Sequence, residues 1–470
     1  MQALQSNTPA RVPKTTRKRE MWLRMGYVTF AVTALLTVVF ALSKPSAKPD
    51  LNYQRQLPGT QRHKGLSPLR FRADGTFHIS IFEDLHFGEN AWDAWGPEQD
   101  LQSVKVINTV LDSEPDIDLV VLNGDLITGD NTFLENSTDY VDQIVRPFAE
   151  RGLNWASTYG NHDNHFNISG AHILAREKRW ANSRTTQMVP SPDGDDVGIS
   201  NYYLPVYPAD CTPSDPPSPL PPCAPKLLLW FFDSRGGFRY QQRNTTTNAL
   251  IPLPNWVDAR VVNWFRQTTT TLTHTHAHNT PTIPALAFVH IPPSASRTLQ
   301  ARGIHPHRQP GLDDDGPLAR QAQGWCADGT PDDGNGGCEY GGQDALFLEV
   351  LAEAPGVLAL FSGHDHGETW CARWEGGEEE GKGKGGEGGK GLDLCFGQHS
   401  GYGGYGRWIR GARQVVVSLE GLAERVVETY IRLESGETVG AVTLNSTYGQ
   451  NWYPATPNDK TRLPTSGEEE

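Results

Sequence analysis

The feature that most constrains this chain is a repeated alternation between short apolar runs and longer amphipathic stretches. The short runs have the length and composition of buried strands, and the longer stretches place apolar residues at helical spacing. Such alternation is typical of an α/β fold. We predict strands at His78–Phe82, Leu119–Leu122, Trp155–Thr158, Lys226–Phe232, Ile283–Val289 and Val357–Phe361. We predict helices at Glu98–Glu114, Thr138–Arg151, Trp256–Arg266 and Gln343–Ala352, and an antiparallel meander from Val415 to Leu444.

Length and charge exclude several classes of protein. A chain of 470 residues can bury a large core, as one domain with insertions or as two smaller domains. The 55 acidic residues outnumber the 41 Lys and Arg residues, which gives a formal net charge of −14. A nucleic-acid-binding protein needs a basic face for phosphates, so we expect no nucleic-acid partner.

The N-terminus indicates a membrane anchor. Residues 1–25 form a basic leader, and residues 26–42 carry no charge. Extended back to residue 21, this stretch reaches the roughly 20 residues that span a bilayer. Because positive flanks stay cytoplasmic, we expect a single-pass protein with a lumenal or extracellular domain, in the secretory pathway, vacuole or cell surface. The alternative is a cleaved signal peptide, for which Ala41 and Ser43 supply small residues, and a secreted product.

Two further features favour an oxidising compartment. Four N-x-S/T sequons begin at Asn136, Asn167, Asn244 and Asn445. The six cysteines fall in close pairs without CxxC spacing, namely Cys211/Cys223, Cys326/Cys338 and Cys371/Cys395. An even count in a secreted context suggests disulfides, although buried free thiols are the alternative. We predict a 371–395 disulfide that closes the base of an insert.

The remaining divisions follow from composition. We expect a polar stem over residues 43–70, a folded domain over 71–450 and a tail over 451–470. Residues 375–391 are low-complexity and have nothing to bury, so we predict a disordered insert. Residues 268–281 also read as an inserted extension.

Polar residues follow five of the predicted strands directly. The five blocks are Asp84–His86, Gly124–Asp125, Gly160–Asp163, His290 and Gly363–His366. Ligands of open α/β sheets bind at the carboxyl ends of strands, so the blocks are predicted to meet. Taken singly, each block would be an ordinary turn or a core histidine. Together, their carboxylates, imidazoles and amide oxygen suit metals such as Zn, Mn or Fe, and a carboxylate such as Asp125 could bridge two ions.

The ordered set D-x-H, G-D, G-N-H-D, H and G-H-x-H resembles the calcineurin-like metallophosphoesterase family, over roughly residues 77–444. The segments HFGENAWDAWGPEQD and CFGQHSGYGGYGRW make the chain most similar to the purple-acid-phosphatase-like branch of fungi and plants. The resemblance implies two packed β-sheets flanked by helices over residues 71–450.

Carried over by position, the resemblance implies two metal ions that share Asp125. The first ion would be bound by Asp84, His86, Asp125 and His366, and the second by Asp125, Asn161, His290 and His364. His162 matches the residue that contacts the phosphate and assists the leaving oxygen, and Asp163 matches its orienting partner. Purple acid phosphatases have an iron-binding tyrosine three residues after the bridging Asp. Here that residue is Thr128, so we expect a colourless protein whose metal pair is Fe, Zn or Mn.

The resemblance implies a hydrolase of phosphoric esters, acting as an acid phosphatase or a phosphoprotein phosphatase. Two cations would lower the pKa of a bridging water and place hydroxide in line with phosphorus, and His162 would protonate the leaving oxygen. The substrate would be a phosphorylated small molecule or a phosphoprotein. Two alternatives stay open: cleavage of phosphodiesters or nucleotide pyrophosphates, and a catalytically silent membrane-tethered binding protein of the same fold.

Other suggestive residues have plainer interpretations. The sequence Gly401–Gly406 fits G-x-G-x-x-G, but a β-like run follows it, so we predict a tight loop near the site rather than a dinucleotide fingerprint. Trp92 and Trp95 could line the substrate mouth or pack in the core. We expect surface positions for a set of histidines: His165, His274, His276, His278, His305 and His307. His399 is grouped with these histidines, and of the set it is the best candidate to line the pocket, because it lies in the Gly/Tyr segment that carries the resemblance.

Overall fold

The computed structural model describes residues 66–190, 195–210, 223–275, 282–315, 322–324, 326, 340–376 and 391–461. The predicted leader and anchor, most of the stem and nearly all of the 375–391 insert lie outside these residues. So do Cys211, Cys338, His276 and His278. Within the described ranges, no helix has both the length and the apolar character needed to cross a bilayer.

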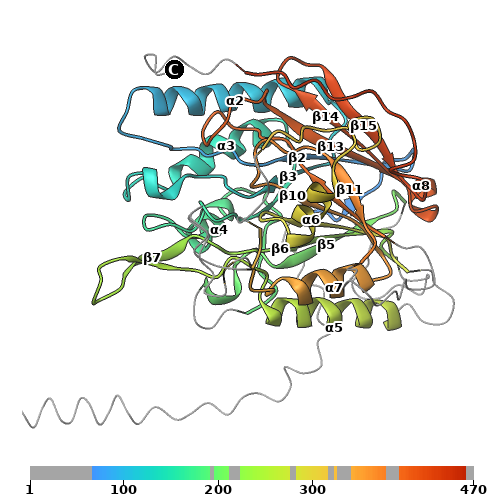
Figure 1. Ribbon diagram of the computed structural model, residues 1–470, viewed down its shortest axis with the longest axis horizontal. Coiled ribbons are helices and arrows are strands. Elements are labelled where there is room, and N and C mark those ends of the chain that lie inside the picture. The colour runs from blue at the N-terminus through green and yellow to red at the C-terminus, as the bar shows by residue number, and fades with distance from the viewer. Residues whose placement is uncertain are drawn as a thin grey trace, which may run out of the picture. The chain divides into compact units, whose positions relative to one another are not determined.

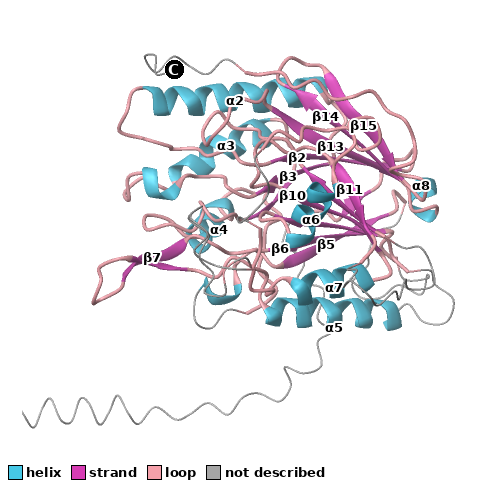
Figure 2. Cartoon of the chain, in the orientation of Figure 1, coloured by secondary structure: helices cyan, strands magenta, loops and turns pink. Residues whose placement is uncertain are grey.

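Two mixed β-sheets form the centre of the domain (Figure 2). The seven-stranded sheet has the order β1 (Leu69–Arg70), β5 (Tyr202–Tyr207), β6 (Leu227–Phe232), β9 (Ala285–Val289), β10 (Val357–Ser362), β12 (Leu392–Phe396) and β11 (Cys371–Trp374). The six-stranded sheet has the order β15 (Thr438–Leu444), β14 (Val427–Leu433), β13 (Gly411–Ser418), β2 (Thr76–Phe82), β3 (Leu119–Asn123) and β4 (Trp155–Thr158). A separate hairpin pairs β7 (Phe238–Arg243) with β8 (Leu250–Pro252).

Alternate residues of each central strand face different layers, because side chains alternate across a sheet. In β3, Leu119 and Val121 pack between the two sheets. Val120 and Leu122 of the same strand face the opposite way, into the core beneath the helices. Strands buried on both faces are therefore apolar throughout, as the sequence pattern indicates.

Helices cover the outer face of each sheet (Figure 1). The helices α2 (Trp95–Ser113) and α3 (Asp139–Glu150) pack on the six-stranded sheet through residues such as Val110 and Phe148. The helices α5 (Ala259–Thr275) and α7 (Ala345–Glu353) pack on the seven-stranded sheet, where the rings of Phe265 and Phe347 lie 5.3 and 5.0 Å from the ring of Phe232. The shorter helices are α4 (Gly170–Glu177), α6 (Ser294–Arg302) and α8 (Leu419–Ala423). The α/β arrangement of two sheets flanked by helices is as predicted.

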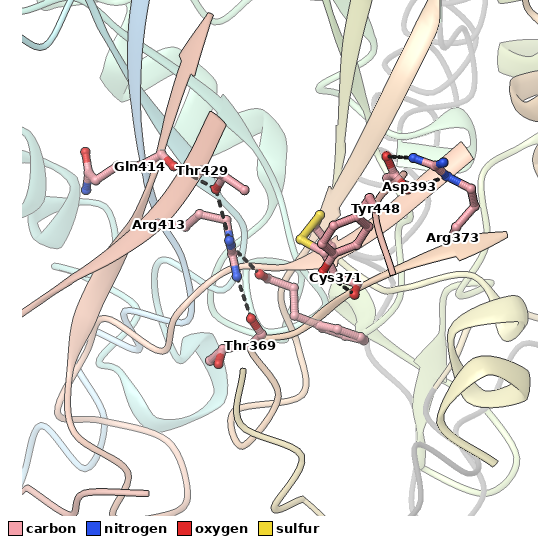
Figure 3. Close-up of a disulfide and its surroundings, with 10 residues drawn as sticks. Thr369, Cys371, Arg373, Asp393, Arg413, Gln414, Thr429 and Tyr448 are labelled. Carbon is pink, nitrogen blue, oxygen red and sulfur yellow. Dashed lines mark hydrogen bonds and ion pairs between the residues drawn. A yellow bond between two sulfur atoms is a disulfide. The ribbon is translucent and has the colours of Figure 1, made fainter. Parts of the chain in front are cut away.

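A disulfide joins Cys371 in β11 to Cys395 in β12, which confirms the predicted 371–395 pair (Figure 3). The two cysteines lie directly opposite each other in the antiparallel register of these strands. The hydroxyl of Tyr448 donates a hydrogen bond of 2.8 Å to the carbonyl of Cys371. Next to the bridge, Arg373 forms an ion pair of 2.9 Å with Asp393. The base of the insert is thus fixed by both covalent and polar contacts.

Most predicted elements are present with shifted ends, and a few regions differ. The 268–281 segment is not wholly an inserted extension, because residues 268–275 form the last turns of α5. The strands β5, β11 and β12, the β7–β8 hairpin, and the helices α4 and α6 lie outside the predicted set. The predicted meander is present as β13, β14 and β15, and β13 also pairs antiparallel with β2.

Candidate metal centre

The five predicted blocks lie at the carboxyl ends of five strands. Strands β2, β3 and β4 are parallel to one another, as are β9 and β10 of the other sheet, so their ends can converge. Backbone hydrogen bonds join the first two loops: the amides of Leu85 and His86 both donate to the carbonyl of Asp125, over 2.9 and 3.0 Å. The structure brings the predicted residues together in two linked groups.

The first group contains Asp84, His86 and His366, all of them buried. Nε2 of His86 lies 3.2 Å from Nε2 of His366. Oδ1 of Asp84 lies 3.5 Å from Nε2 of His366. These three donors, together with Asp125, are the residues predicted to bind the first ion.

The second group contains Asp125, His290 and His364. Nε2 of His290 lies 3.0 Å from Oδ2 of Asp125, yet the contact lacks hydrogen-bond geometry. Asn161 belongs to the predicted set for the same ion. Its Oδ1 is buried and accepts no hydrogen bond from the described residues. A buried, unpaired amide oxygen is costly unless something else coordinates it.

Asp125 stands between the two groups. Its Oδ2 faces His290 at 3.0 Å and Nε2 of His86 at 3.8 Å. Its other oxygen, Oδ1, accepts a hydrogen bond of 2.7 Å from the backbone amide of His162. One carboxylate oxygen therefore faces an imidazole from each predicted ion site, which suits a bridging ligand.

Three of the histidines are oriented through their Nδ1 atoms. Nδ1 of His290 donates to the carbonyl of Asn123 over 2.8 Å, and Nδ1 of His366 donates to the carbonyl of Tyr405 over 2.9 Å. Nδ1 of His86 lies 2.9 Å from the hydroxyl of Thr128. In the neutral form, a donating Nδ1 leaves Nε2 as a lone pair, and these Nε2 atoms are the ones that converge.

The backbone at this site is strained. Four of the predicted ligands have positive φ angles: Asp84 (52°), His86 (48°), Asp125 (48°) and His364 (77°). Non-glycine residues rarely adopt this region, and such strain gathers at functional sites. Gly160 allows the close packing, because a Cβ there would lie 2.2 Å from Oδ1 of Asp125.

The charges and the burial of the site's side chains favour the binding of cations. Burial and the charge of His290 lower the pKa of His364 to about 3, which leaves its imidazole neutral and able to bind a cation. Burial opposes protonation of His290, but the carboxylate of Asp125 raises the pKa of His290 to about 10. Converging Nε2 atoms, a shared carboxylate and an unpaired amide oxygen fit a pair of borderline metal ions.

His162 lies beside the metal groups, close to His86 and Asp125. Burial opposes its protonation, but the carboxylates of Asp125 and Asp130 raise the pKa of His162 to about 9. Nδ1 of His162 lies 3.9 Å from Oδ1 of Asp130, a residue that the sequence interpretation did not single out.

Asp163, the predicted orienting partner of His162, makes backbone contacts instead. It accepts hydrogen bonds from the amides of Leu126, Ile127 and Gly160, at 2.8 to 3.0 Å. These bonds tie the loop after β4 to the loop after β3. Nδ1 of His162 faces the carboxylate of Asp130, and an orienting role for Asp163 remains a prediction.

A cavity of about 490 Å³ opens beside the cluster. Its walls include His162 and several residues outside the predicted set: Glu89, Asp130, His165, Phe238 and Tyr405. His165 is buried, which corrects the expected surface position. Local sequence gives no signal for this burial, since it depends on contact with the distant β7–β8 hairpin.

Several predicted pocket residues lie elsewhere. His399 is buried behind the cluster, with its ring 3.9 Å from the ring of His366, and is not among the residues that line the cavity. Trp92 is 54% exposed and contacts Phe133, and neither Trp92 nor Trp95 lines the cavity. The loop at Gly401–Gly406 does lie at the site, because a Cβ at Gly404 would be 2.5 Å from Cε1 of His366. A strand, β13, follows this loop, as expected.

Two packed sheets with these donors at their strand ends define a metallophosphoesterase. The sequence profile of the family described as "Calcineurin-like phosphoesterase" matches residues 81–368. That match spans more than half of the 470 residues, and the chain belongs to the calcineurin-like phosphoesterase family.

Individual proteins similar to this chain include plant and yeast members. "Probable inactive purple acid phosphatase 28" of Arabidopsis thaliana is 26% identical over 435 residues, which cover 87% of this chain and 91% of that protein. "Phosphatase DCR2" of Saccharomyces cerevisiae is 24% identical over 325 residues, which cover 66% of this chain and 47% of that protein.

Solved structures that superpose on the chain include a dimetal phosphatase from Danio rerio. The superposition has a TM-score of 0.44 at 14% sequence identity, and it covers 79% of this chain and 99% of the length of the Danio rerio chain. The purple acid phosphatase PPD1 of yellow lupin seeds has a TM-score of 0.41 at 11% identity, over 85% of this chain and 59% of its own.

Proposed function

We propose that this protein is a dinuclear-metal phosphatase that hydrolyses phosphomonoesters. The observation that carries the proposal is the convergence of the seven predicted donors beside a 490 Å³ cavity whose wall includes the His162 imidazole. Asp84, His86, Asp125 and His366 would hold one cation, and Asp125, Asn161, His290 and His364 the other. When bound, two such cations supply charge that neutralises phosphate oxygens and activates water.

The side chains around the cations would divide the remaining work. His162 lies where it can give a proton to the leaving oxygen of the ester, because it borders both the donor cluster and the cavity. Asp130 would favour the protonated imidazole through its charge. Thr128 and the carbonyls of Asn123 and Tyr405 would keep the metal-binding imidazoles in one orientation.

The catalytically silent alternative deserves a direct test, because plant relatives carry names that call them probably inactive. A silent protein has no need to retain every donor. Here each predicted ligand position is filled by a metal-binding residue type, and the orienting contacts of three imidazoles are in place. We therefore favour the active enzyme.

Paired assays test this function. Metal-free protein is supplied in turn with Zn, Mn, Fe or Mg and given a chromogenic phosphomonoester and the corresponding bis-ester. We expect turnover of the monoester, and a strong loss of turnover in His162→Gln although the metal pair is still bound. Faster cleavage of the bis-ester would favour the phosphodiesterase alternative. No turnover of either ester with any metal would support the silent binding protein.

We also propose that the catalytic domain faces an oxidising compartment, held there by the N-terminal segment. The Cys371–Cys395 disulfide supports this placement, since such bonds persist in oxidising environments. Asn244 lies exposed in the turn between β7 and β8, so its side chain is accessible for glycosylation. Glycosidase treatment of protein from its native cells should increase its gel mobility, and Asn244→Gln should abolish part of that shift. An unglycosylated, protease-accessible domain on the cytoplasmic side would contradict the placement.

A further inference from the structure

A third group of metal-binding side chains lies beside the predicted pair. Asp130, His162 and His165 each offer a ligand atom within 4.8 Å of the others. Oδ1 of Asp130 lies 3.9 Å from Nδ1 of His162 and 3.9 Å from Nδ1 of His165. The two imidazole rings are stacked, with centroids 5.2 Å apart. One carboxylate oxygen thus faces two imidazole nitrogens.

The nitrogen atoms in this group lack other partners. Among the described residues, nothing hydrogen-bonds to Nδ1 of His162 or to Nδ1 of His165. His165 is 7% exposed, so its unpaired nitrogen is buried and directed toward Asp130. A neutral imidazole with a free lone pair is ready to bind a metal ion.

We propose that Asp130, His162 and His165 form a third cation site, which binds Zn²⁺ and inhibits the enzyme. Two imidazoles and one carboxylate are a common donor set for Zn²⁺ with an open position for water. Tetrahedral zinc at these bond lengths holds its donors about 3.3 Å apart, so the observed 3.9 Å separations need only a small closure. All three residues line the 490 Å³ cavity, through which an ion can enter.

Inhibition follows from the double use of His162. An imidazole nitrogen that binds Zn²⁺ has given up its lone pair and the proton it would carry there. The other ring nitrogen then keeps the N–H of a neutral imidazole, which is a far weaker acid than an imidazolium. Zinc at this site would therefore prevent His162 from forming the imidazolium that protonates the leaving oxygen, while leaving the seven donors of the pair untouched. This consequence rests on the proposed function, whereas binding itself does not.

The binding experiment counts zinc ions. Wild-type protein, His165→Gln and Asp130→Asn are dialysed against the same free Zn²⁺ and analysed for bound metal, with the exposed His305→Gln as a matched control. We expect both site variants to hold one zinc fewer than wild type, and the control to match wild type. Loss of a direct ligand should weaken this site at least ~10-fold, since loss of an outer-sphere partner alone costs 10–100-fold.

Two variants protect this test from a folding failure. Asp130 has a side chain that is 42% exposed, so Asp130→Asn should fold even if the buried His165→Gln does not. Equal zinc content in wild type and both variants would overturn the proposal. The experiment compares the number of zinc ions bound by the wild type and by the variants. Its outcome therefore does not depend on whether the metal pair supports turnover.

The activity experiment measures inhibition by zinc separately for each protein. For each one, turnover with both sites of the metal pair saturated is divided by turnover after addition of excess Zn²⁺. We expect this ratio to reach at least ~10-fold in wild type and in His305→Gln, since loss of a general acid costs on the order of 100-fold or more, and to stay near unity in His165→Gln. Equal inhibition of all three proteins would contradict an inhibitory role, even if the third zinc binds. If no protein turns over either ester, the proposed function fails and the zinc count still decides the third site.

Discussion

The side-chain hydroxyl of Thr128 lies 2.9 Å from Nδ1 of His86. By its place in the sequence, Thr128 corresponds to the iron-binding tyrosine of purple acid phosphatases. In this chain the hydroxyl contacts the imidazole of His86, a predicted metal ligand, on the side opposite Nε2. A contact of this kind would fix the orientation of that ligand.

The first prediction concerns this hydroxyl. Thr128→Val preserves the shape of the buried side chain and removes the contact to His86. We expect metal affinity or turnover to fall by ~10–100-fold, as for other outer-sphere partners of metal-binding histidines. Titration of metal-free protein measures the affinity. Thr132→Val is the matched control, because that buried hydroxyl donates to the carbonyl of Gly129 and contacts none of the predicted metal ligands among the described residues. Equal affinity in both variants would show that Thr128 does not orient His86.

The second prediction concerns colour. Tyr405 is the one tyrosine among the described residues that line the cavity. Its hydroxyl donates to Asp315 and accepts a hydrogen bond of 3.1 Å from the backbone amide of His366, so the phenol oxygen is already engaged in hydrogen bonds. We expect iron-loaded protein to lack the visible charge-transfer band of an iron-bound tyrosinate. An absorption spectrum decides, and a strong visible band that disappears in Tyr405→Phe would reverse this assignment.

The third prediction concerns the shared carboxylate. Asp125→Asn keeps an oxygen and the shape of the side chain, but it removes the charge that faces His86 and His290. We expect turnover to drop more than ~100-fold, beyond the loss typical of outer-sphere partners, and metal content to fall. Steady-state assays and elemental analysis measure both. The exposed Asp116→Asn serves as the control, and near-normal activity of Asp125→Asn would disprove the ligand assignment.

The residues that could be predicted are those whose signal is local. A buried strand and the polar block after it lie within a few positions, and this explains why Asp84, Asp125 and His290 were identified without coordinates. The order of the blocks then supplied the family resemblance. Boundaries shifted by a few residues because tertiary packing, rather than propensity, ends most of these elements.

The residues that sequence reasoning missed depend on distant contacts. From the sequence, His165 is interpreted as a loop histidine. In the structure, the amide of Phe238 donates a hydrogen bond of 2.7 Å to the carbonyl of Asn164, and the Phe238 ring lies 5.4 Å from the His165 ring. This strand of the hairpin comes more than 70 positions later in the chain. Asp130 and His162 are 32 positions apart, and no spacing rule connects the two residues.

The fourth prediction concerns the disulfide. Cys371 and Cys395 are separated by 24 residues, and closing a loop of this length removes entropy from the unfolded chain. Replacing both cysteines by alanine should lower the free energy of unfolding by about 3 kcal/mol. Denaturant unfolding of the double variant, compared with the wild type under non-reducing conditions, measures the difference. An unchanged midpoint would mean that the antiparallel β11–β12 pairing alone holds the base of the insert.

The last prediction concerns pH. Asp100 is buried in α2 and accepts a hydrogen bond of 3.0 Å from the amide of Gly88. Burial outweighs this bond and raises the pKa of Asp100 to about 7, from 3.8 in the unfolded chain. The protonated form is therefore favoured in the folded state. Its contribution to the free energy of unfolding is complete below pH 3.8 and is lost as the pH rises to about 7.

Asp100→Asn isolates this contribution, because an amide does not ionise and can still accept from Gly88. Relative to wild type, the variant should gain stability from pH 4 to pH 8, by an amount on the order of 4 kcal/mol at most. Urea unfolding of both proteins at pH 4, 5.5 and 8 gives the difference, in which all other titrating groups cancel. Asp116→Asn, at a largely exposed carboxylate, should show little such trend. A wild-type-to-variant difference that is constant with pH would mean that folding leaves the pKa of Asp100 unchanged.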